Sequence, residues 1–133
     1  MTNIHNKSIL IVDDDQGMLR ALDKVLTSEG AVVTSVDWGG DAVEILAQQK
    51  HIDLVITDLR MPLVSGISLL RAMRNSFSSI PVIVLTAFGS PEAKAACTEL
   101  GAAVLLEKPL DSARLLAAIG EVLDARDAQD VIG

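Results

Sequence analysis

Five polar side chains follow short apolar runs of the chain, and each stands where its run ends: Asp13, Asp14, Asp58, Thr86 and Lys108. If these runs are neighbouring parallel strands, all five side chains meet at one edge of a sheet. Two carboxylates about 4 Å apart then repel each other by about 4 kcal/mol at an effective dielectric of 20, and one lysine cannot neutralise three acids. Such a cluster of oxygen ligands suits a hard divalent cation such as Mg²⁺.

A divalent cation, an ammonium and a hydroxyl around one carboxylate are the groups that in-line phosphoryl transfer to that carboxylate requires. The cation and Lys108 would offset the charge on the equatorial oxygens, and Asp58 would be the nucleophile. Each acid alone has an ordinary explanation, because an aspartate after a strand is often a turn or cap residue. Asp15 is expected to cap the helix that follows it. The joint placement at strand ends favours the chemical interpretation.

The elements that would position these residues alternate regularly along the chain. Apolar runs predict five strands, at residues 8–12, 31–36, 53–57, 81–86 and 103–106. Apolar residues at helical spacing predict a helix after each strand, with Gly30 and Gly101 ending two of them and Asp111 capping the last. This alternation predicts a parallel sheet between two layers of helices.

Composition narrows the class of protein further. A length of 133 residues predicts one domain, and a formal net charge of −7 argues against a nucleic-acid backbone as partner of this domain. The single Cys97 excludes an internal disulfide and makes a cysteine-based zinc site improbable. The apolar run near the N-terminus is too short for a signal peptide, and no stretch approaches the about 20 apolar residues of a membrane span. We therefore expect a soluble cytoplasmic protein with no membrane partner.

Together, these motifs resemble the receiver domain of bacterial two-component response regulators, from Ile9 to Leu123. The resemblance is carried by residues 9–15, by Asp58-Leu59-Arg60-Met61-Pro62 with Gly66, by residues 84–87 and by Lys108-Pro109. It implies a doubly wound, flavodoxin-like α/β fold, with a five-stranded parallel sheet in the order 2-1-3-4-5 and five helices. The receiver domain would occupy residues 1–124. Residues 125–133, of weak helical character, would be a tail or the start of a linker.

The resemblance also assigns a role to each site residue. Asp58 would be the phospho-acceptor, and Mg²⁺ would be held by Asp13, Asp14, Asp58 and the backbone carbonyl of Arg60. Among these, Asp14 would bind the metal directly and Asp13 largely through water.

Two further residues would meet the phosphoryl group. Lys108 would pair with Asp58 and then with the phosphoryl group, and its peptide bond to Pro109 would be cis, a minority state for X–Pro. Thr86 would swing inward to hydrogen-bond a phosphoryl oxygen.

The sequence departs from the family pattern in places. Leu105 occupies a position where the family often has an aromatic residue that reports phosphorylation, so an aromatic rotamer switch is not expected in its usual form. Leu110 follows Pro109 in place of a common phenylalanine. Arg60 and Phe88 occupy positions that tune dephosphorylation, and they suggest a long-lived phosphorylated form.

As a receiver domain, the chain would take its phosphoryl group from a sensor histidine kinase or a small acyl phosphate. It would catalyse its own phosphorylation and slow dephosphorylation, yet serve as a signalling domain rather than an enzyme. Phosphorylation would change the surface of the fourth helix, fifth strand and fifth helix. That surface could form a homodimer and control a downstream output such as transcription.

Three other classes of function fit the sequence less well. A phosphatase or phosphotransferase with an aspartate nucleophile would need a substrate lid, and the loops here are too short for one. A flavodoxin-like FMN binder would need a phosphate loop after the first strand, where three acids stand instead. An interaction domain independent of phosphorylation would be expected to lose some of the key positions, and all are retained.

Overall fold

A computed structural model describes residues 4–48, 51–59, 66–77, 79–87, 90–109 and 111–132, with side chains described up to residue 127. Within these residues, ten strands and helices alternate along the chain. The strands are β1 (Ser8–Val12), β2 (Val32–Val36), β3 (Leu54–Thr57), β4 (Val82–Thr86) and β5 (Val104–Glu107). The helices are α1 (Gln16–Ser28), α2 (Gly39–Ala47), α3 (Gly66–Ser76), α4 (Pro91–Glu99) and α5 (Ser112–Ile132).

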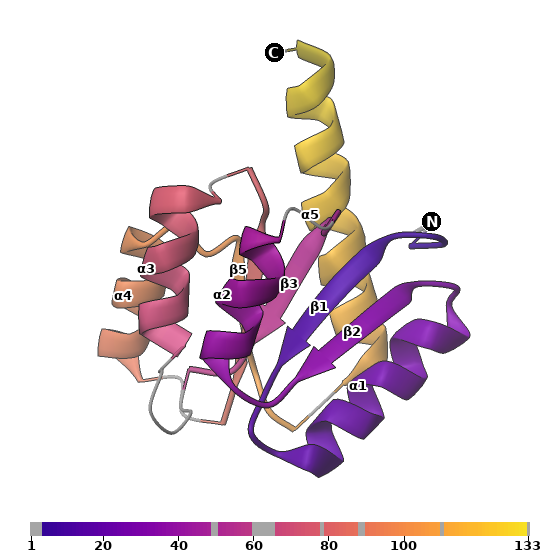
Figure 1. The fold of residues 1–133 in the computed structure, drawn as a ribbon, viewed down its shortest axis with the longest axis horizontal. Helices are drawn as coiled ribbons and strands as arrows, with labels where there is room; N and C mark the ends of the chain where they lie inside the picture. Colours follow the sequence, from indigo (N-terminus) through magenta and orange to yellow (C-terminus); the bar gives the residue numbers. More distant parts are fainter. Residues whose placement is uncertain are drawn as a thin grey trace.

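The five strands pair in parallel in the order β2-β1-β3-β4-β5, which confirms the predicted topology. The central strand β3 is paired on both sides, with Thr57 opposite Val12 of β1 and opposite Val84 of β4. All strands therefore end at the same edge, the lower one in Figure 1. The residues that follow β1, β3, β4 and β5 meet there.

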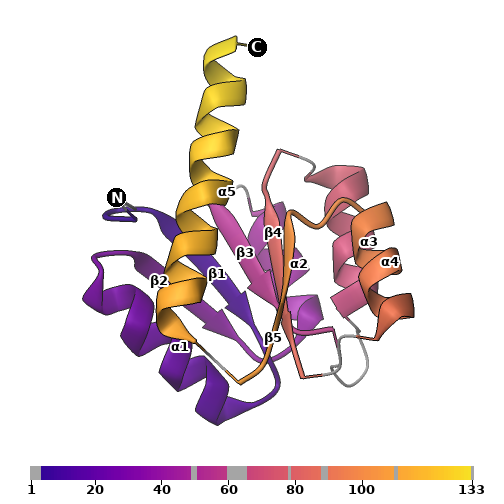
Figure 2. The ribbon, with the colours of Figure 1, turned by 180° about the vertical axis from the view of Figure 1, so that it is seen from behind.

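Helices cover both faces of the sheet. Helices α2, α3 and α4 lie on one side of it, to the left in Figure 1 and to the right in Figure 2, and α1 and α5 lie on the other side. Alternate side chains of each strand enter the two cores, as β1 shows: Ile9 and Ile11 pack towards α1 and α5, whereas Leu10 and Val12 pack towards α2 and α3. This explains the near-continuous apolar runs that marked the strands in the sequence.

The predicted helix boundaries are confirmed where they rest on specific residues. Asp15 caps α1 by accepting hydrogen bonds from the backbone N–H groups of Gly17 and Met18. Gly30 follows α1 with a φ of 87°, a left-handed conformation that glycine adopts without strain. Asp111 accepts a hydrogen bond from the backbone N–H of Arg114 at the start of α5.

Helix α5 continues further than the sequence suggested. Residues 125–132 are part of it, where only weak helical character was expected, and the helix projects beyond the rest of the molecule (Figures 1 and 2). A tertiary contact supports this extension: Arg126 donates hydrogen bonds to the backbone carbonyl and the carboxylate of Asp53, both at 3.0 Å. Within the described part of the chain, no helix is both long and apolar enough to cross a membrane.

Candidate functional site

The lower edge of the sheet brings Asp13, Asp58 and Lys108 together. The Lys108 ammonium Nζ lies 2.8 Å from Asp13 Oδ2 and 3.3 Å from Asp58 Oδ2. The two acids follow neighbouring strands, β1 and β3, and Lys108 follows β5. Three of the five residues predicted to converge are therefore in contact, although Lys108 is 50 and 95 positions away from its two partners in the sequence.

A third acid completes a cluster that could hold a metal ion. Asp13, Asp14 and Asp58 each offer a carboxylate oxygen within 4.8 Å of the others. Asp13 and Asp58 are buried, whereas Asp14 is exposed, so the cluster has one side open to solvent. Three carboxylates with an open side are a suitable donor set for Mg²⁺, which prefers oxygen ligands and retains several waters.

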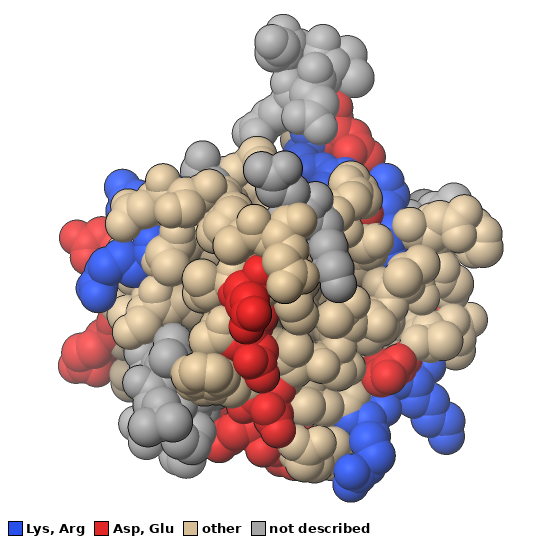
Figure 3. Space-filling view, in the orientation of Figure 1, with Lys and Arg blue, Asp and Glu red and all other residues tan. Residues whose placement is uncertain are grey.

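Acidic side chains also gather on the surface near this edge. Figure 3 shows a band of Asp and Glu running down the face covered by α2 towards the edge where the strands end. The Lys and Arg atoms visible in that view lie outside the band. Such a surface raises the local concentration of cations.

Burial governs the electrostatics of the site. It raises the pKa of the Asp13 carboxyl above its usual range, and the hydrogen bond from Lys108 offsets only part of that rise. Burial alone would lower the pKa of the Lys108 ammonium, but the hydrogen bond to Asp13 and the charges of Asp13 and Asp58 outweigh it, so this pKa is raised. Lys108 therefore stays charged at neutral pH.

Backbone hydrogen bonds fix the two buried acids in place. The Asp13 N–H donates to the carbonyl of Val36 at 3.2 Å, and Asp13 Oδ1 accepts from the Asp15 N–H at 2.9 Å. The Asp58 N–H donates to the carbonyl of Val12 at 3.1 Å. Since Val12 immediately precedes Asp13, the same strand end holds both acids.

Thr86 is the last residue of β4. It lies opposite the last residue of β5, which precedes Lys108. Its side chain is fully buried, and its carbonyl accepts a hydrogen bond from the backbone N–H of Lys108 at 2.8 Å. The Lys108-Pro109 peptide bond is cis, as the family resemblance implied. The hydroxyl and the ammonium are thus carried on backbone segments that are hydrogen-bonded to each other.

Several predicted residues lie outside the described part of the chain: Arg60, Met61, Pro62, Phe88 and Leu110. Leu105, at the position where an aromatic residue was expected, is half-buried and packs against the core between the sheet and helices α2, α3 and α4.

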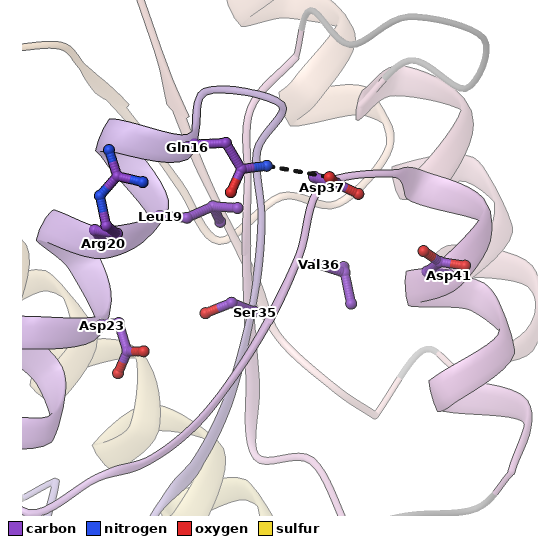
Figure 4. Close-up of a pocket in the computed structure, with 8 residues that line it drawn as sticks. All are labelled: Gln16, Leu19, Arg20, Asp23, Ser35, Val36, Asp37 and Asp41. Carbon is purple, nitrogen blue, oxygen red and sulfur yellow. Dashed lines mark hydrogen bonds between the residues drawn. The ribbon is translucent and has the colours of Figure 1, made fainter.

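Two polar features near the site were not predicted from the sequence. One is the hydroxyl of Thr57, which donates to the carbonyl oxygen of Asp58; a threonine in an apolar strand just before the acceptor was the visible signal. The other is a groove between α1, β2 and α2, shown in Figure 4, where Gln16 Nε2 donates to Asp37 Oδ2 at 3.1 Å. The groove is lined by Gln16, Leu19, Arg20, Asp23, Ser35, Val36, Asp37 and Asp41. It therefore lies beside the acidic cluster and shares no lining residue with it.

Comparison with known proteins agrees with this geometry. The sequence profile of the response regulator receiver domain family matches residues 9–120. The chain belongs to this family. This receiver domain carries its acidic cluster, hydroxyl and ammonium at one edge of the sheet, where its residues 13, 14, 58, 86 and 108 stand at strand ends.

Relatives and solved structures support the assignment. Transcriptional regulatory protein GlrR of Escherichia coli K12 is 40% identical over 116 residues, which are 87% of this chain and 26% of that protein. Probable transcriptional regulatory protein SilR of Salmonella typhimurium is 40% identical over 115 residues, 86% of this chain and 50% of that protein. The chain thus spans a quarter to a half of these two relatives. A CheY-like receiver domain protein from Methanospirillum hungatei JF-1 superposes with a TM-score of 0.89 at 27% identity, covering 93% of this chain and 98% of that one.

Proposed function

We propose that this receiver domain accepts a phosphoryl group on the carboxylate of Asp58 in a reaction that requires Mg²⁺. The observation that carries the proposal is the position of Asp58, buried between the Lys108 ammonium at 3.3 Å and the carboxylates of Asp13 and Asp14. A carboxylate oxygen of Asp58 would attack phosphorus, and the bond from phosphorus to the donor's nitrogen or oxygen would break. The leaving group departs with the electron pair of that bond, and the product is an acyl phosphate.

Each residue of the edge would have a part in this reaction. Asp13, Asp14 and Asp58, with the backbone carbonyl of Arg60, would hold Mg²⁺, which offsets charge on the transferring group and orients it. Lys108 is already within reach of Asp58 and would follow the phosphoryl oxygens. Thr86 would donate a hydrogen bond to one of those oxygens. Metal, ammonium and hydroxyl together would stabilise the charge of the transition state.

Membership of the family supports a proposal for the donor and the output. We propose a sensor histidine kinase as the partner that supplies the phosphoryl group, with a small acyl phosphate as a substitute in vitro. The phosphorylated form would alter the surface of α4, β5 and α5, which could pair two copies of the chain. Two of the similar proteins are named transcriptional regulators, and control of transcription in the cytoplasm is the output we propose. The receiver unit would comprise residues 1–124, and the tail or linker that follows would begin within α5, which continues to Ile132.

The direct test is intact mass after incubation with acetyl phosphate, with and without Mg²⁺. We expect a single phosphoryl adduct that requires Mg²⁺ and is absent from Asp58→Asn. An exposed aspartate on α1, changed in Asp23→Asn, serves as the matched control and should give the same adduct as the unchanged chain. An adduct that persists in Asp58→Asn would contradict the assignment of the acceptor.

A further inference from the structure

Thr57 carries a hydroxyl at a position in the sheet where an apolar side chain would fit. It is the last residue of β3, is fully buried, and stands between two valines of the neighbouring strands, Val12 and Val84. Valine and threonine have almost the same shape, but a buried hydroxyl costs free energy unless it is hydrogen-bonded. The hydroxyl here is bonded: Thr57 Oγ1 donates to the carbonyl oxygen of Asp58 at 3.0 Å.

This bond adds to two others that hold Asp58. The Asp58 N–H is bonded to the carbonyl of Val12 at 3.1 Å, and the side chain accepts from Lys108 at 3.3 Å. The hydrogen bond from Thr57 is made to a third group of Asp58, its backbone carbonyl. It therefore fixes the plane of the peptide between Asp58 and Leu59, and Leu59 is itself buried in the core. With both neighbouring peptides held, the direction of the Asp58 side chain is defined.

We infer that Thr57 is a positioning residue, whose hydroxyl orients Asp58 for metal binding and phosphoryl transfer through the Asp58 carbonyl. The inference rests on the proposed function, since it concerns the residue proposed as acceptor. Small displacements of a reacting group lower the rates of reactions that depend on alignment. Loss of one hydrogen bond between uncharged groups should slow phosphorylation by about two- to tenfold.

The test compares Thr57→Val, which keeps the shape and removes the hydroxyl, with Thr57→Ser, which keeps the hydroxyl. Thr34→Val, on the edge strand β2, is the matched control for the same substitution in a strand. The initial rate of phosphorylation by acetyl phosphate and the Kd for Mg²⁺ are measured for each, with Tm as the check on folding. We expect a slower rate and weaker Mg²⁺ binding in Thr57→Val alone, with recovery in Thr57→Ser.

A spectroscopic measurement keeps the inference separate from the proposed function. The ¹³C resonance of the Asp58 carbonyl should shift in Thr57→Val and return towards its original position in Thr57→Ser. A purely structural role for Thr57 would lower Tm in Thr57→Val while leaving the rate and the Kd unchanged, and that result would overturn the inference. If the unchanged chain takes no phosphoryl group, the proposed function fails, and the effect of Thr57→Val on the Kd and the resonance still decides the role of Thr57.

Discussion

The Lys108 ammonium lies closer to Asp13, at 2.8 Å, than to Asp58, at 3.3 Å. The cation that would follow the phosphoryl group is thus shared between the proposed acceptor and one of the acids proposed to hold Mg²⁺. Its charge offsets part of the repulsion within the acidic cluster, and it also opposes the arrival of a second cation. If the cluster binds Mg²⁺ as proposed, Lys108 and the metal would compete for the same carboxylate charge.

Replacing Lys108 tests whether its charge opposes the binding of Mg²⁺ and whether it is needed for rapid phosphorylation. In Lys108→Met the ammonium no longer repels the metal, so we expect a lower Kd for Mg²⁺ together with loss of rapid phosphorylation. Isothermal titration measures the Kd, and intact mass measures the phosphoryl adduct. Lys24→Met, an exposed lysine on α1, is the control and should change neither. Weaker Mg²⁺ binding in Lys108→Met would mean that Lys108 organises the acids more than it repels the metal.

Asp14 and Asp15 are adjacent in the sequence, but their replacement should affect different properties: phosphorylation for Asp14 and stability for Asp15. Asp15 accepts the capping hydrogen bonds of α1, so Asp15→Ala should lower the free energy of unfolding by about 0.5–2 kcal/mol and leave Mg²⁺ binding nearly intact. Asp14 belongs to the cluster of acids that could hold a metal ion, so Asp14→Ala should abolish Mg²⁺-dependent phosphorylation. Urea unfolding and metal titration of both variants test this division. Equal loss of Mg²⁺ binding in the two variants would contradict it.

The sheet and the edge that bears the acids could be predicted because both follow from local patterns. Each strand is a short apolar run, and parallel strands place their carboxyl ends together, so residues after the runs must meet. The closer pairing of Lys108 with Asp13 could not be predicted, since a difference of half an ångström depends on side-chain packing. The family resemblance implied only its pairing with Asp58.

The contact between Asp53 and Arg126 was missed for a different reason. These residues are 73 positions apart, and each has an ordinary appearance in the sequence: a polar residue at a strand start and a charged residue in a mixed tail. No periodicity connects them. Only the tertiary structure, which lays α5 across the amino end of β3, shows why the helix continues past residue 124.

Arg126 should contribute to stability without affecting the site. Arg126→Gln removes two hydrogen bonds to Asp53 and deprives a buried carboxylate of its cation, so we expect a loss of about 1.5–3 kcal/mol in the free energy of unfolding. Amide hydrogen exchange in residues 124–132 should accelerate. Phosphorylation should be unchanged, because Asp53 lies at the opposite end of β3 from Asp58. Asp127→Asn, which removes a more exposed partner of Arg126, should cost less than about 1 kcal/mol.

The same contact predicts how stability depends on pH. Burial alone would raise the pKa of Asp53, but hydrogen bonds from the Ser8 N–H and from Arg126, with the charges of His51 and Arg126, outweigh it and lower this pKa below the usual value. The unfolded chain therefore binds a proton at Asp53 at a higher pH than the folded chain does. The stabilisation is fully present above the unfolded pKa, about 4, and is lost as the pH falls through the lower folded pKa.

The measurement is the free energy of unfolding of the unchanged chain and of Asp53→Asn between pH 8 and pH 3. The difference between the two should be constant down to about pH 5 and shrink below about pH 4. His51 Nε2 lies 2.9 Å from Asp53 Oδ1 and also carries a charge when protonated. The same two proteins are then compared with His51→Gln added to each, which removes that charge. The difference in their free energies of unfolding should still shrink below about pH 4. A difference that stays constant to pH 3 would show that Asp53 keeps its ordinary pKa in the folded chain.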